Sequence, residues 1–235
     1  MAALVPDLPQ VEQHIVAMTN QVRQEQKLPP LKVNAMLARA AQAFAQKVAN
    51  SGKFSHTADG RTPAQRAESV GYKHCEIAEN LAMDEDSRGF DTGALALQAI
   101  AGWMNSPPHR ANILGASVSE IGVGVARAPG IKPKFISVEL FGQPASRALT
   151  FKIKNVAKIE VTYSYGGKAY DLKPGRSVVH SSCLRDQLVI SMPGSLLSPA
   201  REIARFKAEN EKLYTLKSDA SGMPKLEITM RSTGP

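Results

Sequence analysis

The first third of the chain places apolar residues at helical spacing. One run begins after the helix breaker Pro9, and its apolar members are Val11, Ile15, Met18 and Val22. A second run lies between Asn34, a residue type that caps helix N-termini, and Gly52, a residue type that ends helices. Its apolar members are Leu37, Ala41, Phe44 and Val48. The spacing of four, three and four positions predicts two amphipathic helices.

Proline positions predict where three further helices begin or end. Thr62-Pro63 has the residue types of an N-cap followed by the first helical position, and Gly71 ends that short helix. A longer helix opens at Thr92 and must stop near Asn105, because Ser106-Pro107-Pro108 bars continuation. The same tripeptide can cap a new helical turn over residues 109–114.

After Glu120 the period of the pattern changes from helical to two. Apolar residues alternate along 121–125 and again along 135–140, and the two runs flank Pro129-Gly130, which predicts an antiparallel hairpin. Gly122 and Gly124 occupy alternate strand positions, which usually marks close approach by another backbone or a helix. Helices followed by strands predict an α+β layered domain.

From Leu149 onward the pattern is mostly that of short strands. The runs are separated by Gly- and Pro-containing turns, at spacings typical of a small sandwich or meander. The segment 199–213 is ambiguous between helix and strand. Because Ala204, Phe206 and Ala208 alternate, we expect a strand pair across Glu209-Asn210.

Composition is that of an ordinary globular protein. The chain has 235 residues, of which 43% are hydrophobic and 21% charged, which excludes collagenous, low-complexity and wholly disordered classes. The longest apolar stretch, Ala94 to Met104, is far shorter than the roughly 20 residues that cross a bilayer. We therefore expect a protein without a transmembrane segment.

Charge divides the chain into two parts. Residues 1–146 hold 14 Lys+Arg and 13 Asp+Glu, whereas residues 147–235 hold 15 and 8, which recovers the net charge of +8. Pro and small residues coincide with this step at 142–146, so we expect one domain over 1–146 and a basic, β-rich domain over 147–235. Such asymmetry indicates attraction to polyanions, although a basic face kept for solubility is an equal alternative.

Residues that could carry chemistry occur in three places: His56, the pair Glu79-Asn80 inside what reads as an apolar turn, and His109-Arg110 behind two prolines. Taken alone, a single His is more often a surface imidazole than a ligand. A carboxylate among apolar residues either faces solvent or is paired. Spacing by itself therefore assigns no site.

Together, these segments resemble one family. The motifs occur in the order Leu28-Pro-Pro-Leu31, Leu37-Ala-Arg-Ala-Ala41, Phe54-Ser-His56, Ala78-Glu-Asn-Leu81, Trp103 to Leu114, Glu120-Ile-Gly-Val-Gly124 and Phe135 to Gly142. This order is similar to the CAP superfamily of cysteine-rich secretory, antigen-5 and pathogenesis-related proteins, and closest to its bacterial SCP-like branch. The resemblance covers about residues 10–142. It implies an α-β-α sandwich and, usually, secretion.

The resemblance also implies a shallow cavity lined by two His and two acids, which can hold a divalent cation such as zinc. His56, Glu79 and His109 match three of these positions, and His56 and His109 are the implied metal ligands. The second acid falls on Ser106, so Glu120 is a candidate substitute, or a partner for Arg110. The candidate cavity residues are His56, Glu79, Asn80, Ser106, His109, Arg110 and Glu120.

Catalysis by His56, Glu79 and His109 would need a nucleophile or an activated water, and Ser55 and Ser106 both have structural roles as alternatives. The resemblance implies secretion, and binding more often than catalysis, so we expect a secreted binding protein, with a metal-dependent hydrolase and a non-catalytic envelope scaffold as alternatives. The expected partners are an anionic polysaccharide, a membrane surface, or a host or envelope protein. Nucleic acid is the least favoured partner, because Arg clusters lack aromatic neighbours for stacking.

The two cysteines, Cys75 and Cys183, are not spaced as a redox or zinc motif, and form either a bridge or two separate thiols. Cys75 lies just before the Glu79 motif and Cys183 in the basic domain, and we predict that they pair. A lasting bridge requires an oxidising compartment. The predicted bridge and the family resemblance both favour export, although residues 1–6 lack the features of a secretory signal. We therefore expect a secreted or periplasmic protein whose leader is absent from this sequence.

Overall fold

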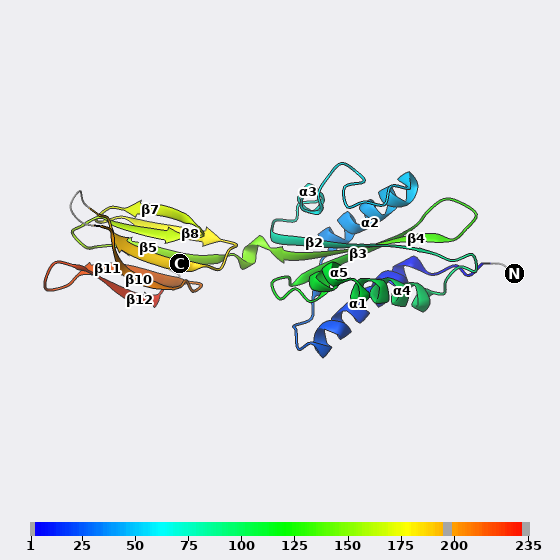
Figure 1. Ribbon diagram of the computed structural model, residues 1–235, viewed down its shortest axis with the longest axis horizontal. Coiled ribbons are helices and arrows are strands. Elements are labelled where there is room, and N and C mark those ends of the chain that lie inside the picture. The colour runs from blue at the N-terminus through cyan, green and yellow to red at the C-terminus, as the bar shows by residue number, and fades with distance from the viewer. Residues whose placement is uncertain (1–2, 195–198, 232–235) are drawn as a thin grey trace. The chain divides into compact units, whose positions relative to one another are not determined.

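The protein divides into two compact units, Met1–Ser146 and Arg147–Pro235 (Figure 1). The structure is a computed structural model that describes residues 3–194 and 199–231. Among the described residues, none of the helices combines the length and apolar character that crossing a bilayer requires.

The described part of the first unit, residues 3–146, holds five α-helices and a four-stranded sheet. The sheet has the order β1-β3-β4-β2, in which β1 runs parallel to β3 and the other neighbours are antiparallel. The strands are β1 (Lys32–Val33), β2 (His74–Glu85), β3 (Glu120–Arg127) and β4 (Lys134–Pro144). The helices are α1 (Leu8–Glu25), α2 (Ala35–Ser51), α3 (Pro63–Ser69), α4 (Thr92–Asn105) and α5 (Pro107–Ile113). The predicted hairpin of β3 and β4 is confirmed.

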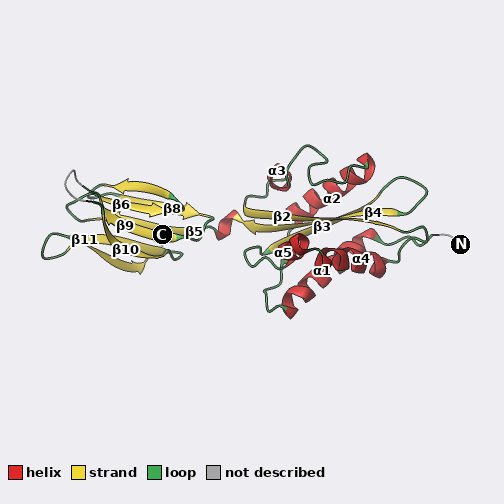
Figure 2. Ribbon diagram, in the orientation of Figure 1, coloured by secondary structure: helices red, strands yellow, loops and turns green. Residues whose placement is uncertain are grey.

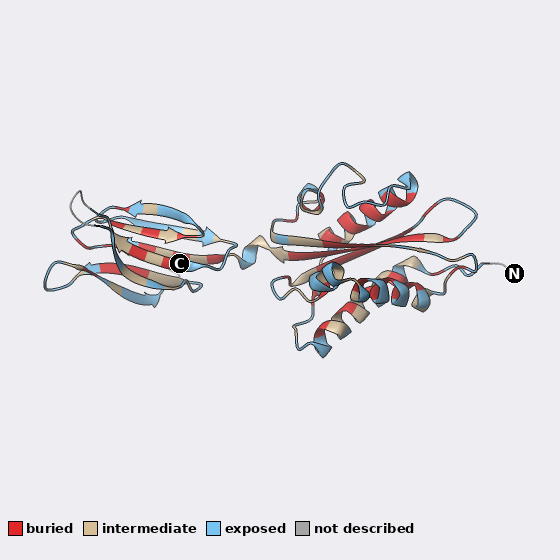
Figure 3. Ribbon diagram, viewed as in Figure 1, coloured by how far each residue is buried: buried red, intermediate tan, exposed pale blue. Residues whose placement is uncertain are grey.

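Helices cover both faces of this sheet. Figure 1 shows α2 and α3 on one side and α1, α4 and α5 on the other. Each side has its own apolar core, one centred on residues such as Trp103 and Phe141, the other on residues such as Phe44 and Leu140. Figure 3 shows the buried positions running along the sheet between the two helical layers. The expected α-β-α sandwich is therefore confirmed.

Local sequence signals set most helix ends. The Asn34 side chain accepts from the amides of Met36 and Leu37 at the start of α2, and Gly52 ends that helix at φ +66°. Thr62 forms a capping box with Gln65 at the start of α3. Ser106 is the N-cap residue of α5 but makes no side-chain capping hydrogen bond.

The segment around Glu79 is a strand, which corrects the expectation of an apolar turn. It lies within β2, at one edge of the sheet and in register with β4. Ala78 and Ala82 pack into one core, and Leu81 packs into the other. Because apolar residues of β2 face helices on both sides, the alternation that normally reveals a strand is absent.

The two strand glycines let a helix approach the sheet. A Cβ on Gly122 would lie 2.1 Å from the Ala38 nitrogen, and one on Gly124 would lie 2.2 Å from the Gln42 nitrogen. Both contacts are with the backbone of α2, so the predicted close approach is confirmed.

The second unit consists of two four-stranded sheets (Figure 2). One has the order β10-β9-β6-β7 and the other β12-β11-β5-β8. A short 3₁₀ helix, η1 (Ala145–Arg147), precedes β5. The strands are β5 (Leu149–Asn155), β6 (Val161–Tyr165), β7 (Lys168–Leu172), β8 (Ser177–Ser182), β9 (Gln187–Met192), β10 (Arg201–Lys207), β11 (Lys212–Ser218) and β12 (Pro224–Met230). Side chains from both sheets share one apolar core, so the unit is a β-sandwich.

The strands β10 and β11 form as expected on either side of Glu209-Asn210, but they do not pair with each other. β10 pairs with β9, whereas β11 lies in the other sheet between β5 and β12. The expected strand pair is therefore wrong. A turn pattern shows that the chain reverses but not which sheet it joins next.

Candidate functional site

A buried carboxylate on the edge strand β2 holds a half-exposed imidazole. Glu79 lies on β2 with a side chain that is 1% exposed, and its Oε1 accepts a hydrogen bond of 2.7 Å from His56 Nδ1. The His56 side chain is 49% exposed. The bond fixes the orientation of the ring and leaves Nε2 as the nitrogen that a ligand can meet.

Arg66 of α3 completes this arrangement, and sequence reasoning missed it. Its guanidinium donates to Glu79 Oε2, and lies 3.5 Å from the centre of the Phe44 ring. Arg66 also binds the loop that carries His56, because it donates to the backbone oxygen of His56 at 3.0 Å and of Arg61 at 2.8 Å. The side chain is 4% exposed, and nothing in the spacing of the sequence reveals this burial.

The second imidazole belongs to His109, which lies in the first turn of α5 directly after Pro107 and Pro108. Its pKa is lowered, first by partial burial and second by the charge of His56, so the neutral ring is favoured. The structure brings His56 and Glu79 into direct contact, and it places His109 on a helix that is bound to the strand carrying Glu79.

Two asparagines fasten α5 to β2. Asn80 Nδ2 donates to the backbone oxygen of His109 at 3.2 Å. In return, Asn112 Nδ2 donates to the backbone oxygen of Glu79 at 3.2 Å and to Asn80 Oδ1 at 2.9 Å. Asn80, which the sequence placed in the cavity, is fully buried, so it positions neighbouring groups rather than facing a ligand.

Glu139 of β4 is a second buried acid, and it contacts Asn80. Its carboxylate accepts from Thr19 Oγ1 at 2.5 Å and from Asn80 Nδ2 at 3.2 Å. Burial raises the pKa of Glu139 to about 7, although the hydrogen bonds and the charge of Arg23 act in the opposite direction. No sequence signal identifies this residue, because strand alternation does not distinguish a buried carboxylate from an exposed one.

In the part of the chain that the structure describes, the side chains of Glu120, Arg110 and Ser106 make no hydrogen bond or ion pair to His56, Glu79 or His109. Glu120 accepts from the Tyr72 hydroxyl at 2.7 Å and from Asn34 Nδ2 at 3.2 Å. It is the first residue of β3, and Asn34 is the N-cap of α2. Within the described residues, Arg110 forms no ion pair and so does not bind Glu120. Ser106 is half-buried at the start of α5.

The residues present do not fit the divalent cation that the family resemblance implies. Both oxygens of Glu79 are already engaged, one by His56 and the other by the guanidinium of Arg66. Arg66 supplies the positive charge that a cation would bring to this carboxylate. Across residues 3–194 and 199–231, no three His, Cys, Asp or Glu side chains are placed to hold a metal ion.

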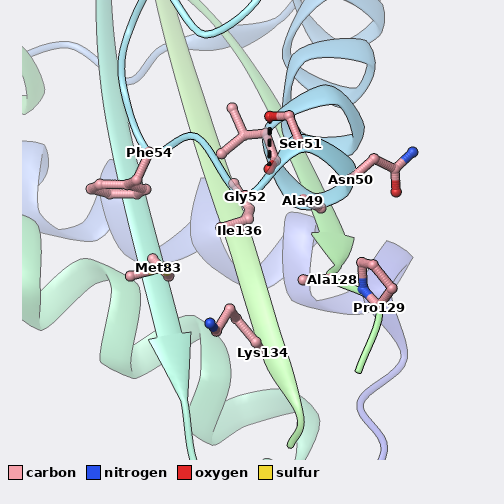
Figure 4. A pocket seen from close by; sticks show the side chains of 11 residues that line it. Ala49, Asn50, Ser51, Gly52, Phe54, Met83, Ala128, Pro129, Lys134 and Ile136 are labelled. Carbon is pink, nitrogen blue, oxygen red and sulfur yellow. Dashed lines mark hydrogen bonds between the residues drawn. The ribbon is translucent and has the colours of Figure 1, made fainter. Parts of the chain in front are cut away.

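A separate pocket lies at the C-terminal end of α2 (Figure 4). It has a volume of about 260 Å³ and is formed by the last turn of α2, Phe54, and residues of β2 and β4. Figure 4 shows Phe54 and Met83 on one side of it and Lys134 at its edge. His56, Glu79 and His109 do not line this pocket.

Comparisons with known proteins agree with the motif order. The model of the cysteine-rich secretory protein family (CAP) matches residues 16–139. The chain belongs to the CAP family. The match includes the two imidazoles, Glu79 and Glu139, and ends before the β-sandwich.

One curated relative comes from a bacterium. The chain is 30% identical over 121 residues to the uncharacterized protein YkwD of Bacillus subtilis (strain 168), covering 51% of this chain and 44% of YkwD. It therefore spans less than half the length of this curated relative.

Solved structures with similar folds include two surface or extracellular proteins. The first is an outer surface protein of Borrelia burgdorferi, with a TM-score of 0.48, 21% identity, and coverage of 57% of this chain and 93% of that one. The second is an extracellular protein containing a SCP domain from Bacillus anthracis, with a TM-score of 0.49, 23% identity, and coverage of 61% and 45%.

Both cysteines, Cys75 and Cys183, are disulfide-bonded. The alternative of two separate thiols is therefore wrong. A disulfide that persists needs an oxidising environment, such as the cell exterior or the periplasm.

Proposed function

We propose that this CAP-family chain is an exported binding protein with two binding regions. The CAP unit presents the polar site of His56 and His109 to a ligand, and the basic β-sandwich docks on an anionic surface. The observation that carries the first part is the half-exposed ring of His56, fixed by a buried Glu79 that Arg66 holds in turn.

Rigidity at this site favours recognition. The loop carrying His56 is bound to Arg66, and α5 carrying His109 is bound to β2 through Asn80 and Asn112. A ligand therefore meets side chains whose orientation is already set, and loses less entropy on binding. Because His109 favours its neutral form, the pair of rings offers both hydrogen-bond donors and acceptors near neutral pH.

The test uses the two imidazoles as reporters. Chemical shifts of the ¹⁵N-labelled His56 and His109 rings are followed while a panel of carboxylate- and amide-bearing fragments is titrated. We expect saturable shifts of both rings in the unmodified protein, and no shift of the His109 ring in His56→Ala. If no fragment moves either ring and His56→Ala only lowers thermal stability, the site is a scaffold element and the proposal is wrong.

A second candidate function, hydrolysis without a metal, follows from the bond between His56 Nδ1 and Glu79. An imidazole oriented by a carboxylate is the arrangement of a general base. The nearest serine in sequence, Ser55, bonds Thr57 Oγ1 instead of the ring, so water would be the nucleophile. Turnover of p-nitrophenyl esters or peptides that disappears in His56→Ala and persists in chelator would support hydrolysis over binding alone.

Charge supports the proposed docking role of the sandwich. Residues 147–235 hold 15 Lys+Arg and 8 Asp+Glu, a difference of +7. Retention on an anionic support at low ionic strength, lost as salt is added, tests this role. Absence of retention at low salt would contradict it.

A further inference from the structure

The outward face of the sheet β12-β11-β5-β8 gathers lysines. In β5, Phe151 and Ile153 are buried in the sandwich core, so the residues between and after them, Lys152 and Lys154, point away from it. This alternation leaves two lysines on the outer face of one central strand, about 7 Å apart at the usual rise per residue.

Strand register adds two more lysines to this face. β11 runs parallel to β5 with Leu213 opposite Lys152 and Thr215 opposite Lys154, so Lys217 lies two positions further along the same face. β12 places Lys225 directly opposite Lys217. We call Lys152, Lys154, Lys217 and Lys225 the lysine face.

Acidic neighbours only partly neutralise the lysine face. Glu227 pairs with Lys217. The pKa of Asp219, in the turn between β11 and β12, is lowered first by the hydroxyl of Ser221 and least by the charge of Lys225. Lys152 and Lys154 have no ion-pair partner within the described part of the chain. Lys217 and Lys225 also face each other across the ladder, and like charges directly opposite are unfavourable unless an anion intervenes.

The other sheet of the sandwich lacks this excess. On its outer side, Arg205 of β10 is paired with Glu202. Asp171 of β7 accepts from the hydroxyl of Thr162 on the neighbouring strand. By register, the outer positions of this second sheet balance two basic residues, Arg205 and Lys207, with two acids, Glu202 and Asp171, whereas the lysine face sets four lysines against Glu227.

The uncharged side chains that lie between the lysines indicate which class of polyanion this face binds. Hydroxyl side chains share this face, and Thr150 Oγ1 bonds Ser181 Oγ across the strands β5 and β8. By register, Thr229 and Ser177 lie on the same side, and both are exposed. Among the described residues, the outward positions of these strands include no aromatic ring. The face therefore offers no platform for nucleic-acid bases and no aromatic anchor for a bilayer.

We propose that the lysine face binds an acidic polysaccharide. This proposal rests on the docking role of the sandwich given under Proposed function. Lys152, Lys154 and Lys225 each meet a separate sulfate, phosphate or carboxylate group along the polymer, and the threonine and serine hydroxyls bond sugar hydroxyls between these charges.

The experiment compares two variants of the full chain with equal net charge. Lys152→Gln, Lys154→Gln and Lys225→Gln remove the lysine face but keep the ion pair of Lys217 with Glu227. The matched control replaces three exposed lysines outside this sheet, Lys168→Gln, Lys173→Gln and Lys207→Gln. Binding to heparin is measured at several salt concentrations, with single-stranded DNA and phosphatidylglycerol vesicles as parallel probes.

We expect the lysine-face variant to bind heparin roughly tenfold more weakly or worse, with a shallower salt dependence, while the control stays within about twofold. Equal thermal stability of the three proteins shows that the comparison is between folded chains. Heparin should also bind more tightly than the other two probes.

The outcomes separate this proposal from the broader one. If both variants lose binding equally, overall charge governs docking, so the lysine face is wrong and the docking role stands. If the unmodified chain binds no anionic probe at low salt, the docking role fails as well. Tighter binding to vesicles or to DNA overturns the choice of polysaccharide.

Discussion

Arg66 and Glu79 form an ion pair within the CAP unit in which both side chains are nearly inaccessible to solvent, at 4% and 1% exposure. The same guanidinium also binds Asp59 Oδ1 at 3.0 Å. One side chain therefore satisfies the buried carboxylate and fastens the loop that carries His56. A buried carboxylate that remains ionised requires a positive partner.

Removing that partner should be severely destabilising. We expect Arg66→Met to lower the free energy of unfolding by about 3–5 kcal/mol, because Glu79 is left charged and buried. Urea denaturation measures the change. Arg61→Ala is the control, since only the backbone oxygen of Arg61 contacts Arg66, and it should change stability by less than about 0.5 kcal/mol. Similar losses in the two variants would contradict the role assigned to Arg66.

Glu139 should make stability depend on pH. Its pKa is raised in the folded state from 4.5 to about 7, so its favourable contribution is full below about pH 4.5 and is lost as pH rises through 7. Glu139→Gln removes this titration. We expect its stability relative to the unmodified protein to improve by about 2–3 kcal/mol between pH 5 and pH 8.

Denaturant titrations of both proteins at the two pH values check this, and the difference between them cancels other titrating groups. A relative stability that does not change with pH would show that Glu139 titrates normally.

The approach of α2 to the sheet should make Gly124 irreplaceable. A Cβ there would lie 2.2 Å from the Gln42 nitrogen, so Gly124→Ala must displace the helix and should cost about 3 kcal/mol. Gly102→Ala is the matched control, because that glycine lies in α4 with no atom within 4 Å of its added Cβ. Thermal unfolding should show the control to be neutral or stabilised by up to about 1 kcal/mol.

The chain has two cysteines, and we predict that Cys75 and Cys183 bond to each other within one molecule. Closing a loop of 108 residues (183 minus 75) contributes up to about 5 kcal/mol in the chain-entropy model. Mass spectrometry of native, unreduced protein should show a monomer that takes up no alkylating reagent, and two labels after reduction. A disulfide-linked dimer, or two labels without reduction, would refute the pairing.

Much of the CAP unit could be predicted from sequence because its elements are bounded by local signals. Asn34 and Gly52 set the ends of α2 through contacts within the helix itself, and the strand glycines indicated the close approach of a helix. The strand containing Glu79 escaped prediction because its apolar residues face both sides of the sheet.

For the candidate site, sequence identified His56, Glu79 and His109 through their motifs but missed Arg66 and Glu139. An arginine and a glutamate are usually exposed, and only their burial makes them part of this site. Motif position made Glu120 a candidate for the second acid of the site, but its carboxylate accepts from the Tyr72 hydroxyl instead. The sequence does not reveal that contact.

The sequence by itself determined the helices, the β-hairpin, the layered CAP domain and the basic character of the C-terminal region, because these depend on periodicity, capping and charge along the chain. Tertiary structure decided which sheet β11 joins, which charge neutralises Glu79, and which lysines share a face. These depend on contacts between residues distant in sequence, where register and burial set the energy of each group.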